Sequence, residues 1–144
     1  EYEILDMQIV IESTGTELAA QNRTEKDLER LSQLLDEASL VLDNPEEFTQ
    51  AGQKFHLAII EASGNRALVA QFKSLRHVIW PRGAKRAKRE IAEHAYEVHQ
   101  KLFTMIKEGE AEPARKLMVA HLSSIRTIAF PENNKQSSNG PICC

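Results

Sequence analysis

Cysteine is almost absent from this sequence, and its two copies, Cys143 and Cys144, stand together at the carboxyl end. Neither has an upstream partner, so there is no disulfide framework and we expect a reducing, cytoplasmic setting. No apolar run approaches the roughly 20 residues that span a bilayer, so we expect no membrane association. The acidic start, "EYEILDMQIV", lacks the pattern of a signal peptide and an initiating methionine. We therefore expect the chain to be part of a longer protein.

An excess of charge of one sign is also missing. The net charge is −3 over 144 residues, so the chain as a whole carries no electrostatic footprint for nucleic acid. Apolar residues make up 42% and charged residues 27%, which is ordinary for a globular protein, and the length suffices for one domain with a real core.

Strand-like alternation is lacking too, whereas helical periodicity runs through most of the chain. Helix starts are indicated by "TEKD" at 24–27 and "NPEE" at 44–47, and stops by Gly64 and Gly109. We expect six helices: one over about 1–22, a second after Thr24, a third from 44 to "SGN", a fourth through 68–79, a fifth over about 85–108 and a sixth over about 110–130. Pro81 and Gly83 separate the fourth from the fifth. The fold class is thus all-α, an antiparallel bundle over residues 1–130, with 131–144 as a disordered tail.

Three of the five histidines fall on or beside inward-facing stripes of three different helices. His56 lies next to Phe55 and Ile59, His99 shares a stripe with residues from Ile91 to Ile106, and His121 shares one with its apolar neighbours. Any one of them alone is commonly a hydrogen-bonded core residue. Three in one small bundle favour a shared metal, because unpartnered buried imidazoles are costly and neutral imidazole is a common metal ligand. Both interpretations stay open on the sequence alone.

The remaining histidines, His77 and His94, are predicted to be surface or packing residues. His94 precedes His99 by five residues, which is not the spacing that points two ligands the same way. The Glu-x-x-His signature of diiron bundles is absent, which argues against a ferritin-like oxidase. There is no HExxH, no phosphate-cradling glycine loop and no G-x-S-x-G, so we assign no catalytic residue.

Two basic features stand out in the sequence: a run of arginines and lysines, and the single residue Arg76. The run "RGAKRAKRE" is either a solvated helix start or a patch that binds an anion or a partner; its cations are Arg82, Lys85, Arg86, Lys88 and Arg89. Arg76 differs because it lies within an apolar helical segment. It could reach into the bundle to pair a carboxylate, or extend to solvent.

Three segments together resemble the FCD domain, the FadR-like carboxyl-terminal effector domain of the gluconate-repressor (GntR) superfamily of bacterial transcription regulators. "FTQAGQKFHLAIIEASGN" resembles the family's D-x-x-x-H segment followed by S-G-N. "HQKLFTMIKEGEAEPARKLMVAHL", residues 99–122, carries two histidines 22 residues apart, as the end of that domain does. "TEKDLERLSQLLDEA" resembles its second helix. The resemblance covers about residues 1–130 in family order.

The resemblance implies a helical bundle that binds a small carboxylate-type effector, in many members with a divalent metal held by one Asp and three His. The three histidines fall on His56, His99 and His121, and the metal implied is zinc, nickel or manganese. The Asp position falls on Gly52, and Gln8 stands where many members have an arginine. A missing carboxylate should lower cation affinity, while Gly52 leaves room for a water or a larger effector. Gly52, Gln8 and Arg76 are the predicted effector-binding residues.

We therefore expect a ligand-sensing and dimerisation domain of a GntR-type regulator that is not an enzyme, works as a homodimer and senses a small organic acid. The family's winged helix-turn-helix has no counterpart in these residues, so operator binding is expected of the parent protein. The alternative is a three-histidine metalloenzyme acting on a small carboxylate compound, for which the sequence offers no general base because Glu97 should point away from His99. A helical scaffold with packed histidines and no ligand is a third possibility.

Overall fold

A computed structural model describes residues 2–79 and 89–129 of the chain. Over these ranges it contains six helices and no strand: α1 Tyr2–Asn22, α2 Glu25–Ser39, α3 Pro45–Ala62, α4 Arg66–Ile79, α5 Arg89–Glu108 and α6 Ala111–Ala129. The expected all-α fold with six helices is confirmed. The predicted break at Pro81 and Gly83, most of the basic run and the tail over 131–144 lie outside the described residues. No described helix combines the length and the apolar character that crossing a membrane requires.

Side-chain caps explain where two of the helices begin. The Thr24 hydroxyl accepts a hydrogen bond from the Asp27 amide at 3.2 Å, and the Asp27 carboxylate accepts one from the Thr24 amide at 2.9 Å. This reciprocal capping box starts α2. The Asn44 side chain accepts from two first-turn amides of α3, with Pro45 at the first helical position.

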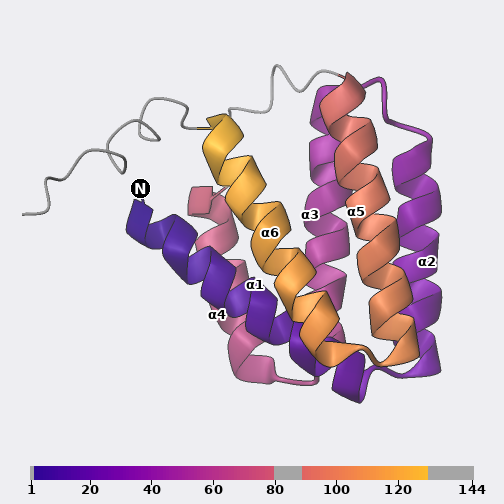
Figure 1. Ribbon diagram of the computed structural model, residues 1–144, viewed down its shortest axis with the longest axis vertical. Coiled ribbons are helices and arrows are strands. Elements are labelled where there is room, and N and C mark those ends of the chain that lie inside the picture. Colours follow the sequence, from indigo (N-terminus) through magenta and orange to yellow (C-terminus); the bar gives the residue numbers. More distant parts are fainter. Residues whose placement is uncertain (1, 80–88, 130–144) are drawn as a thin grey trace, which may run out of the picture.

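Two glycines explain where α3 and α5 stop. Gly64 has φ of +70° and Gly109 has φ of +76°. Side chains disfavour this left-handed region, and glycine adopts it without penalty, so both residues reverse the chain after a helix. The turns that follow are short, and successive helices run in opposite directions (Figure 1).

The packing places α1 at the centre of the arrangement. It lies beside α6 and in front of α4 in Figure 1, and it contacts α3 and α5 as well. On the other side of the bundle, α2 packs against α3 and α5. Side chains from five of the six helices therefore surround one interior. The remaining helix, α4, packs its Phe72 against Ile11 of α1 and Ile60 of α3 in a smaller cluster.

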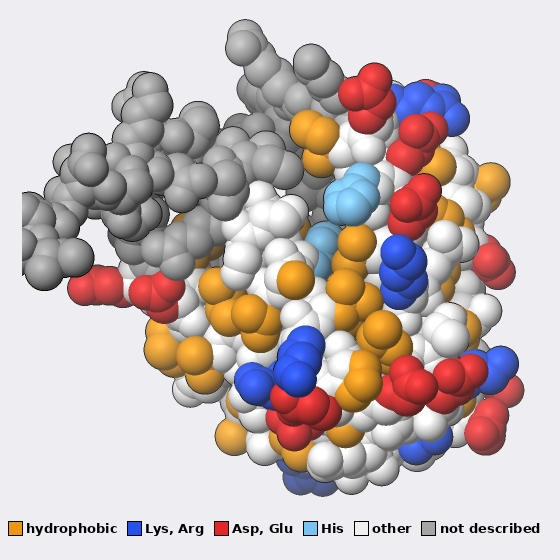
Figure 2. All heavy atoms as spheres, in the orientation of Figure 1, with side chains coloured by type: hydrophobic (Ala, Val, Ile, Leu, Met, Phe, Trp, Pro, Cys, Tyr) orange, Lys and Arg blue, Asp and Glu red, His pale blue; other side chains and the backbone are white. Residues whose placement is uncertain are grey.

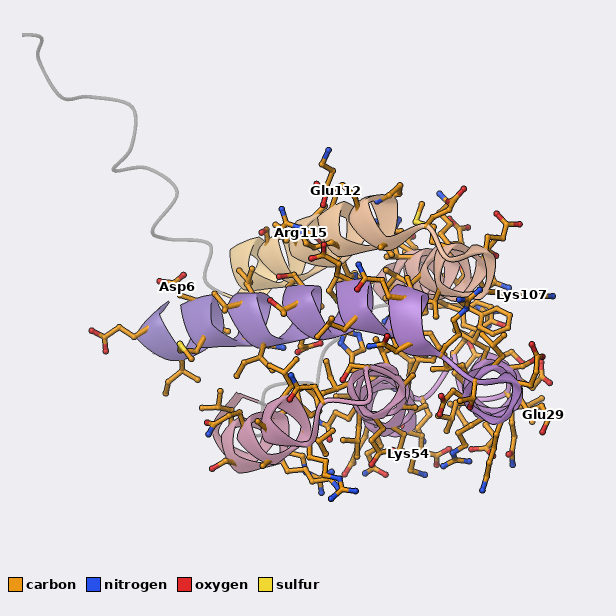
Figure 3. All side chains as sticks on the ribbon, turned by 90° about the horizontal axis from the view of Figure 1, so that it is seen from below. Asp6, Glu29, Lys54, Lys107, Glu112 and Arg115 are labelled. Carbon is orange, nitrogen blue, oxygen red and sulfur yellow. The ribbon has the colours of Figure 1, made fainter. Side chains whose placement is uncertain are left out.

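The main core is aliphatic and closely filled. Its fully buried members include Leu31, Leu34, Ile59, Leu102 and Met118. The six charged side chains that Figure 3 labels lie outside this core: Asp6, Glu29, Lys54, Lys107, Glu112 and Arg115.

One predicted core position is wrong. The sequence pattern puts Ile91 on the inward stripe of the fifth helix, but its side chain is 37% exposed, whereas Ala92 is buried. Adjacent helical residues point about 100° apart, because there are 3.6 residues per turn. The inward line of α5 therefore passes through Ala92, His99, Leu102 and Ile106 and leaves Ile91 at its edge.

Candidate metal and effector site

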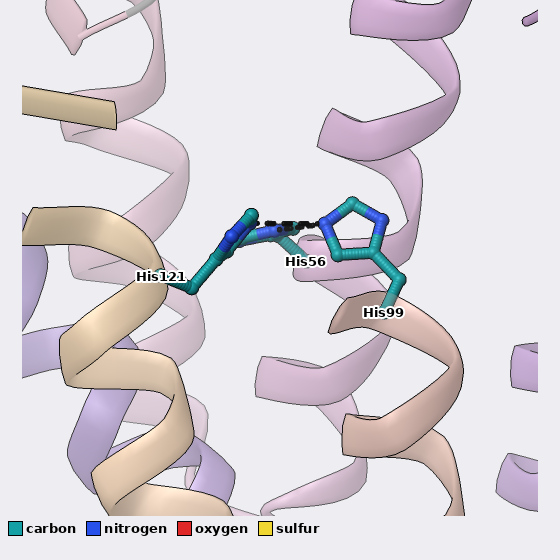
Figure 4. Close-up of side chains that lie close together, drawn as sticks. All are labelled: His56, His99 and His121. Atoms are coloured by element: carbon teal, nitrogen blue, oxygen red, sulfur yellow. Dashed lines mark hydrogen bonds between the residues drawn. The ribbon is translucent and has the colours of Figure 1, made fainter. Parts of the chain in front are cut away.

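Three histidines from three helices meet inside the bundle. His56 comes from α3, His99 from α5 and His121 from α6, and Figure 4 shows their rings turned toward one another. The Nε2 atom of His99 lies 3.0 Å from Nε2 of His56 and 3.1 Å from Nε2 of His121. The three side chains are only 1–6% exposed. Figure 2 shows histidine side chains on one face of the molecule, one of them recessed between its neighbours.

These spacings suit a shared cation. One ligand nitrogen from each histidine lies within 4.8 Å of the other two. Nitrogens bound to one zinc at its usual bond length stand about 2.9 Å apart in octahedral and about 3.4 Å apart in tetrahedral geometry. The Nε2 separations of 3.0 and 3.1 Å fall within that interval.

Hydrogen bonds among the three rings cannot satisfy both of the close nitrogen–nitrogen contacts. A neutral imidazole carries one N–H and one lone pair. Nε2 of His99 faces Nε2 of both other histidines, so a proton on it can be donated well to only one of them. A cation accepts all three lone pairs at once, which makes the donor set chemically suited to a metal.

Burial keeps the rings of His99 and His121 unprotonated, so that their nitrogens can bind a cation. Burial lowers the pKa of His99 well below its ordinary value of 6.5, and repulsion from His56 and His121 lowers this pKa further. Burial likewise lowers the pKa of His121 to about 3, helped by His56 and His94. Both rings are therefore neutral at neutral pH and keep a free lone pair.

A buried carboxylate that the sequence analysis missed adjoins the cluster. Glu12 of α1 has no exposed surface, and its Oε2 contacts Nδ1 of His56. Its Oε1 accepts a hydrogen bond from Nε2 of Gln8 at 2.7 Å. Hydrophobic periodicity could not reveal Glu12, because the buried side of α1 is polar or small at this point. The available signal was the helical spacing of Gln8, Glu12, Gly15 and Ala19, all of which are buried.

Gly52 lies at the cluster. Helical spacing directs a side chain at position 52 the same way as that of His56, four residues on. A Cβ at position 52 would also meet Cε1 of His99 at 3.6 Å, an ordinary contact, with no other such neighbour within 4 Å. The reason is that α5 packs across this point of α3, so its histidine faces the glycine. A Cβ could be added here without displacing anything.

The other predicted residues are not among the three that converge. Gln8 is buried, but its amide is bonded to Glu12 rather than to a histidine. Arg76 is half-buried on α4, a helix that packs against α1 and α3 and contributes none of the three histidines. His94 is exposed, as expected. The His77 side chain lies outside the described part of the structure.

An open groove of about 440 Å³ lies apart from the histidines, between α2 and α5. Its lining includes Glu25, Glu29 and Asp36 against a single lysine, Lys107. Such a rim repels a carboxylate. This groove is therefore poorly suited to an acidic ligand.

Over the residues that the structure describes, helices packed around an interior cluster of nitrogen donors define an all-helical domain with a buried polar centre. Sequence comparison identifies the family: the FCD domain profile matches residues 3–124, and the chain belongs to this family of GntR-type regulator domains.

Curated relatives are named transcription regulators. The Uxu operon regulator of Haemophilus influenzae is 30% identical over 136 residues, which cover 90% of this chain and 51% of that protein. The putative L-lactate dehydrogenase operon regulatory protein of Escherichia coli is 34% identical over 132 residues, covering 88% and 50%. LutR of Bacillus subtilis is 27% identical over 140 residues, covering 91% and 64%. The chain thus spans between half and two thirds of the length of these relatives.

A solved structure shows the same fold. The regulator McbR/YncC of E. coli superimposes with a TM-score of 0.73 at 20% identity, over 90% of this chain and 64% of that one. Neither the names of the relatives nor this likeness supports the metalloenzyme alternative.

Proposed function

We propose that this chain is the effector-sensing domain of a GntR-type transcription regulator, in which His56, His99 and His121 bind a divalent cation and the cation binds a small organic acid. The observation that carries the proposal is the convergence of three buried imidazoles on one point. Zinc, nickel and manganese are the cations considered, because imidazole suits the first two and an added carboxylate suits the third.

An organic acid fits this centre for two reasons. Three neutral ligands leave coordination positions open and the charge of a dication uncompensated, and a carboxylate supplies both the oxygen and the charge. Gly52 contributes no side chain beside His99, so no side chain at this position competes with an incoming carboxylate. One relative is named for an L-lactate dehydrogenase operon, and L-lactate belongs to this class of acid.

The signal would pass as a shift between two arrangements of a homodimer. An effector that binds one arrangement more tightly moves the population toward it, by no more than its differential affinity. Two-fold symmetry of the dimer would match two half-sites of an operator. Operator binding, in the cytoplasm, belongs to a part of the parent protein outside these residues.

Catalysis is the weaker alternative for this centre. A metal-activated water needs a general base beside an open coordination position. Glu12, the buried carboxylate of the cluster, stands behind His56 with both oxygens engaged. Glu12 therefore orients the ring of His56, a ligand of the proposed cation, and its oxygens are not available to act as a general base.

Calorimetry on the EDTA-stripped chain tests the proposal. Zinc, nickel and manganese chlorides are titrated first, and L-lactate and other small carboxylic acids are then titrated into metal-loaded and stripped protein. We expect one cation per chain and acid binding only to the loaded form. Equal acid binding in EDTA would show that effector binding does not need a metal. Absence of both cation binding and acid binding would contradict the sensing role.

Gly52→Asp should tighten cation binding at least about tenfold, because a carboxylate would enter beside His99 and even outer-shell partners change metal affinity by 10–100-fold. The added Cβ meets only an ordinary contact, so the variant should fold. Loss of a mid-helix glycine should add up to about 1 kcal/mol of stability, partly offset by the helix propensity of aspartate. Zinc titration by calorimetry measures the gain.

Gly52→Asn is the matched control, since it has nearly the same shape without the charge. Equal zinc affinity of Gly52→Asp and Gly52→Asn, or no gain in either, would show that the family's aspartate position does not carry over to residue 52.

A further inference from the structure

The cluster contains one charge whose role the three-histidine site does not explain. Glu12 is a carboxylate with no exposed surface, in the middle of α1 and amid the helices that carry the histidines. An isolated buried carboxylate is very costly, so its partners must compensate it. Those partners are the Gln8 amide at 2.7 Å and Nδ1 of His56.

These contacts bear on the tautomer of the His56 ring. An ionised carboxylate only accepts hydrogen bonds, so beside an ionised Glu12 the proton of His56 belongs on Nδ1, which donates it to the carboxylate. In the neutral ring the lone pair then lies on Nε2. That is the atom 3.0 Å from Nε2 of His99, in the centre of the cluster. Gln8 donates to the other oxygen and thereby holds the carboxylate itself in place.

We propose that Glu12 is the positioning residue of the cation site: it holds His56 in the tautomer that presents Nε2, and its negative charge offsets part of the cation's charge through the imidazole ring. This inference rests on the proposed function. Carboxylate–imidazole–metal chains make the ligand more basic, and losing such a carboxylate typically costs 10–100-fold in metal affinity. In this chain the arrangement has added weight, because the position that would supply a direct carboxylate is Gly52.

Glu12→Gln provides the test, because it keeps the size of the side chain and removes its charge. We expect the zinc affinity of the stripped protein to fall 10–100-fold. The matched control is Glu17→Gln, the same change on the same helix. The Glu17 carboxylate is partly exposed, and its charged partner is Arg115, whose Nε lies 3.8 Å away. The zinc affinity of this control should stay within twofold of wild type.

A measurement that a purely structural role would not move accompanies the titration. Nitrogen NMR of the His56 ring in metal-free wild type should show the proton on Nδ1, and Glu12→Gln should shift part of the population to the Nε2–H form. This readout stands even if Glu12→Gln fails to fold, because a wild-type ring protonated on Nε2 alone would overturn the proposal.

The outcomes separate the inference from the function on which it rests. If wild type binds no cation, both the proposed function and this inference fail. If wild type binds zinc and Glu12→Gln binds it within twofold as tightly, the site stands and the role of Glu12 is overturned. An equal loss in Glu17→Gln would also overturn it, since the effect would then be one of net charge alone.

Discussion

Zinc should raise the melting temperature of this protein, and His121→Ala should abolish the rise. A ligand that binds only the folded state stabilises it by mass action, by about 2.7 kcal/mol when its free concentration is a hundred times its Kd. For a domain of this size that corresponds to roughly 5–11 °C. His121 supplies one of the three converging nitrogens, and its loss leaves two neutral ligands. Thermal unfolding with zinc and with EDTA measures both effects.

His94→Ala is the control for this experiment. It removes a histidine of the same helix that carries His99, but an exposed one. Its zinc-dependent rise should match that of wild type. A rise that survives in His121→Ala would mean that zinc binds elsewhere, and a rise lost equally in both variants would point to binding by surface histidines.

Acid should destabilise the metal-free protein well before its carboxylates titrate. In the folded state the pKa of His121 is about 3 and that of His99 lies well below 6.5, mainly because both are buried, whereas the unfolded chain titrates near 6.5. Below pH 6.5 the unfolded state therefore binds more protons, and the free energy of unfolding falls as the pH falls. The limiting slope is about 1.4 kcal/mol per pH unit for each of the two residues.

Urea unfolding in EDTA between pH 7.5 and 5 measures this slope above the range in which ordinary carboxylates titrate. His121→Ala should reduce it by up to half, since one of the two groups is gone. Stability that stays level down to pH 5, or that falls equally in wild type and His121→Ala, would show that the histidines are not buried as neutral rings.

Local signals in the sequence predicted the helices well. Caps such as Thr24 and Asn44 and stops such as Gly64 act within one turn of chain, so they can be read without knowing the rest of the fold. The histidines were identifiable because three helices each placed one on an inward stripe. Their convergence on one point depends on how α3, α5 and α6 pack, so the sequence could suggest it but could not establish it.

The features that the sequence analysis missed are those set by packing between helices. Glu12 is polar and shares its buried line with Gln8, Gly15 and Ala19, so hydrophobic periodicity does not indicate its burial. The contact of position 52 with His99 depends on how α5 packs against α3, so spacing along α3 alone could not reveal it. The rotation of α5 about its own axis decides that Ala92 is buried and Ile91 is partly exposed, and this rotation is set by packing against other helices.

The cluster also has a consequence for how the chain folds. Its contacts join residues 44, 43 and 22 positions apart and draw on the first helix and the last. Closing such long loops costs chain entropy before any contact forms, so we expect the cluster to assemble late in folding. A cation bound there would act as a cross-link among α3, α5 and α6 that forms after the early folding nucleus. It would therefore slow unfolding far more than it speeds folding, and its release would accompany the opening of the whole bundle.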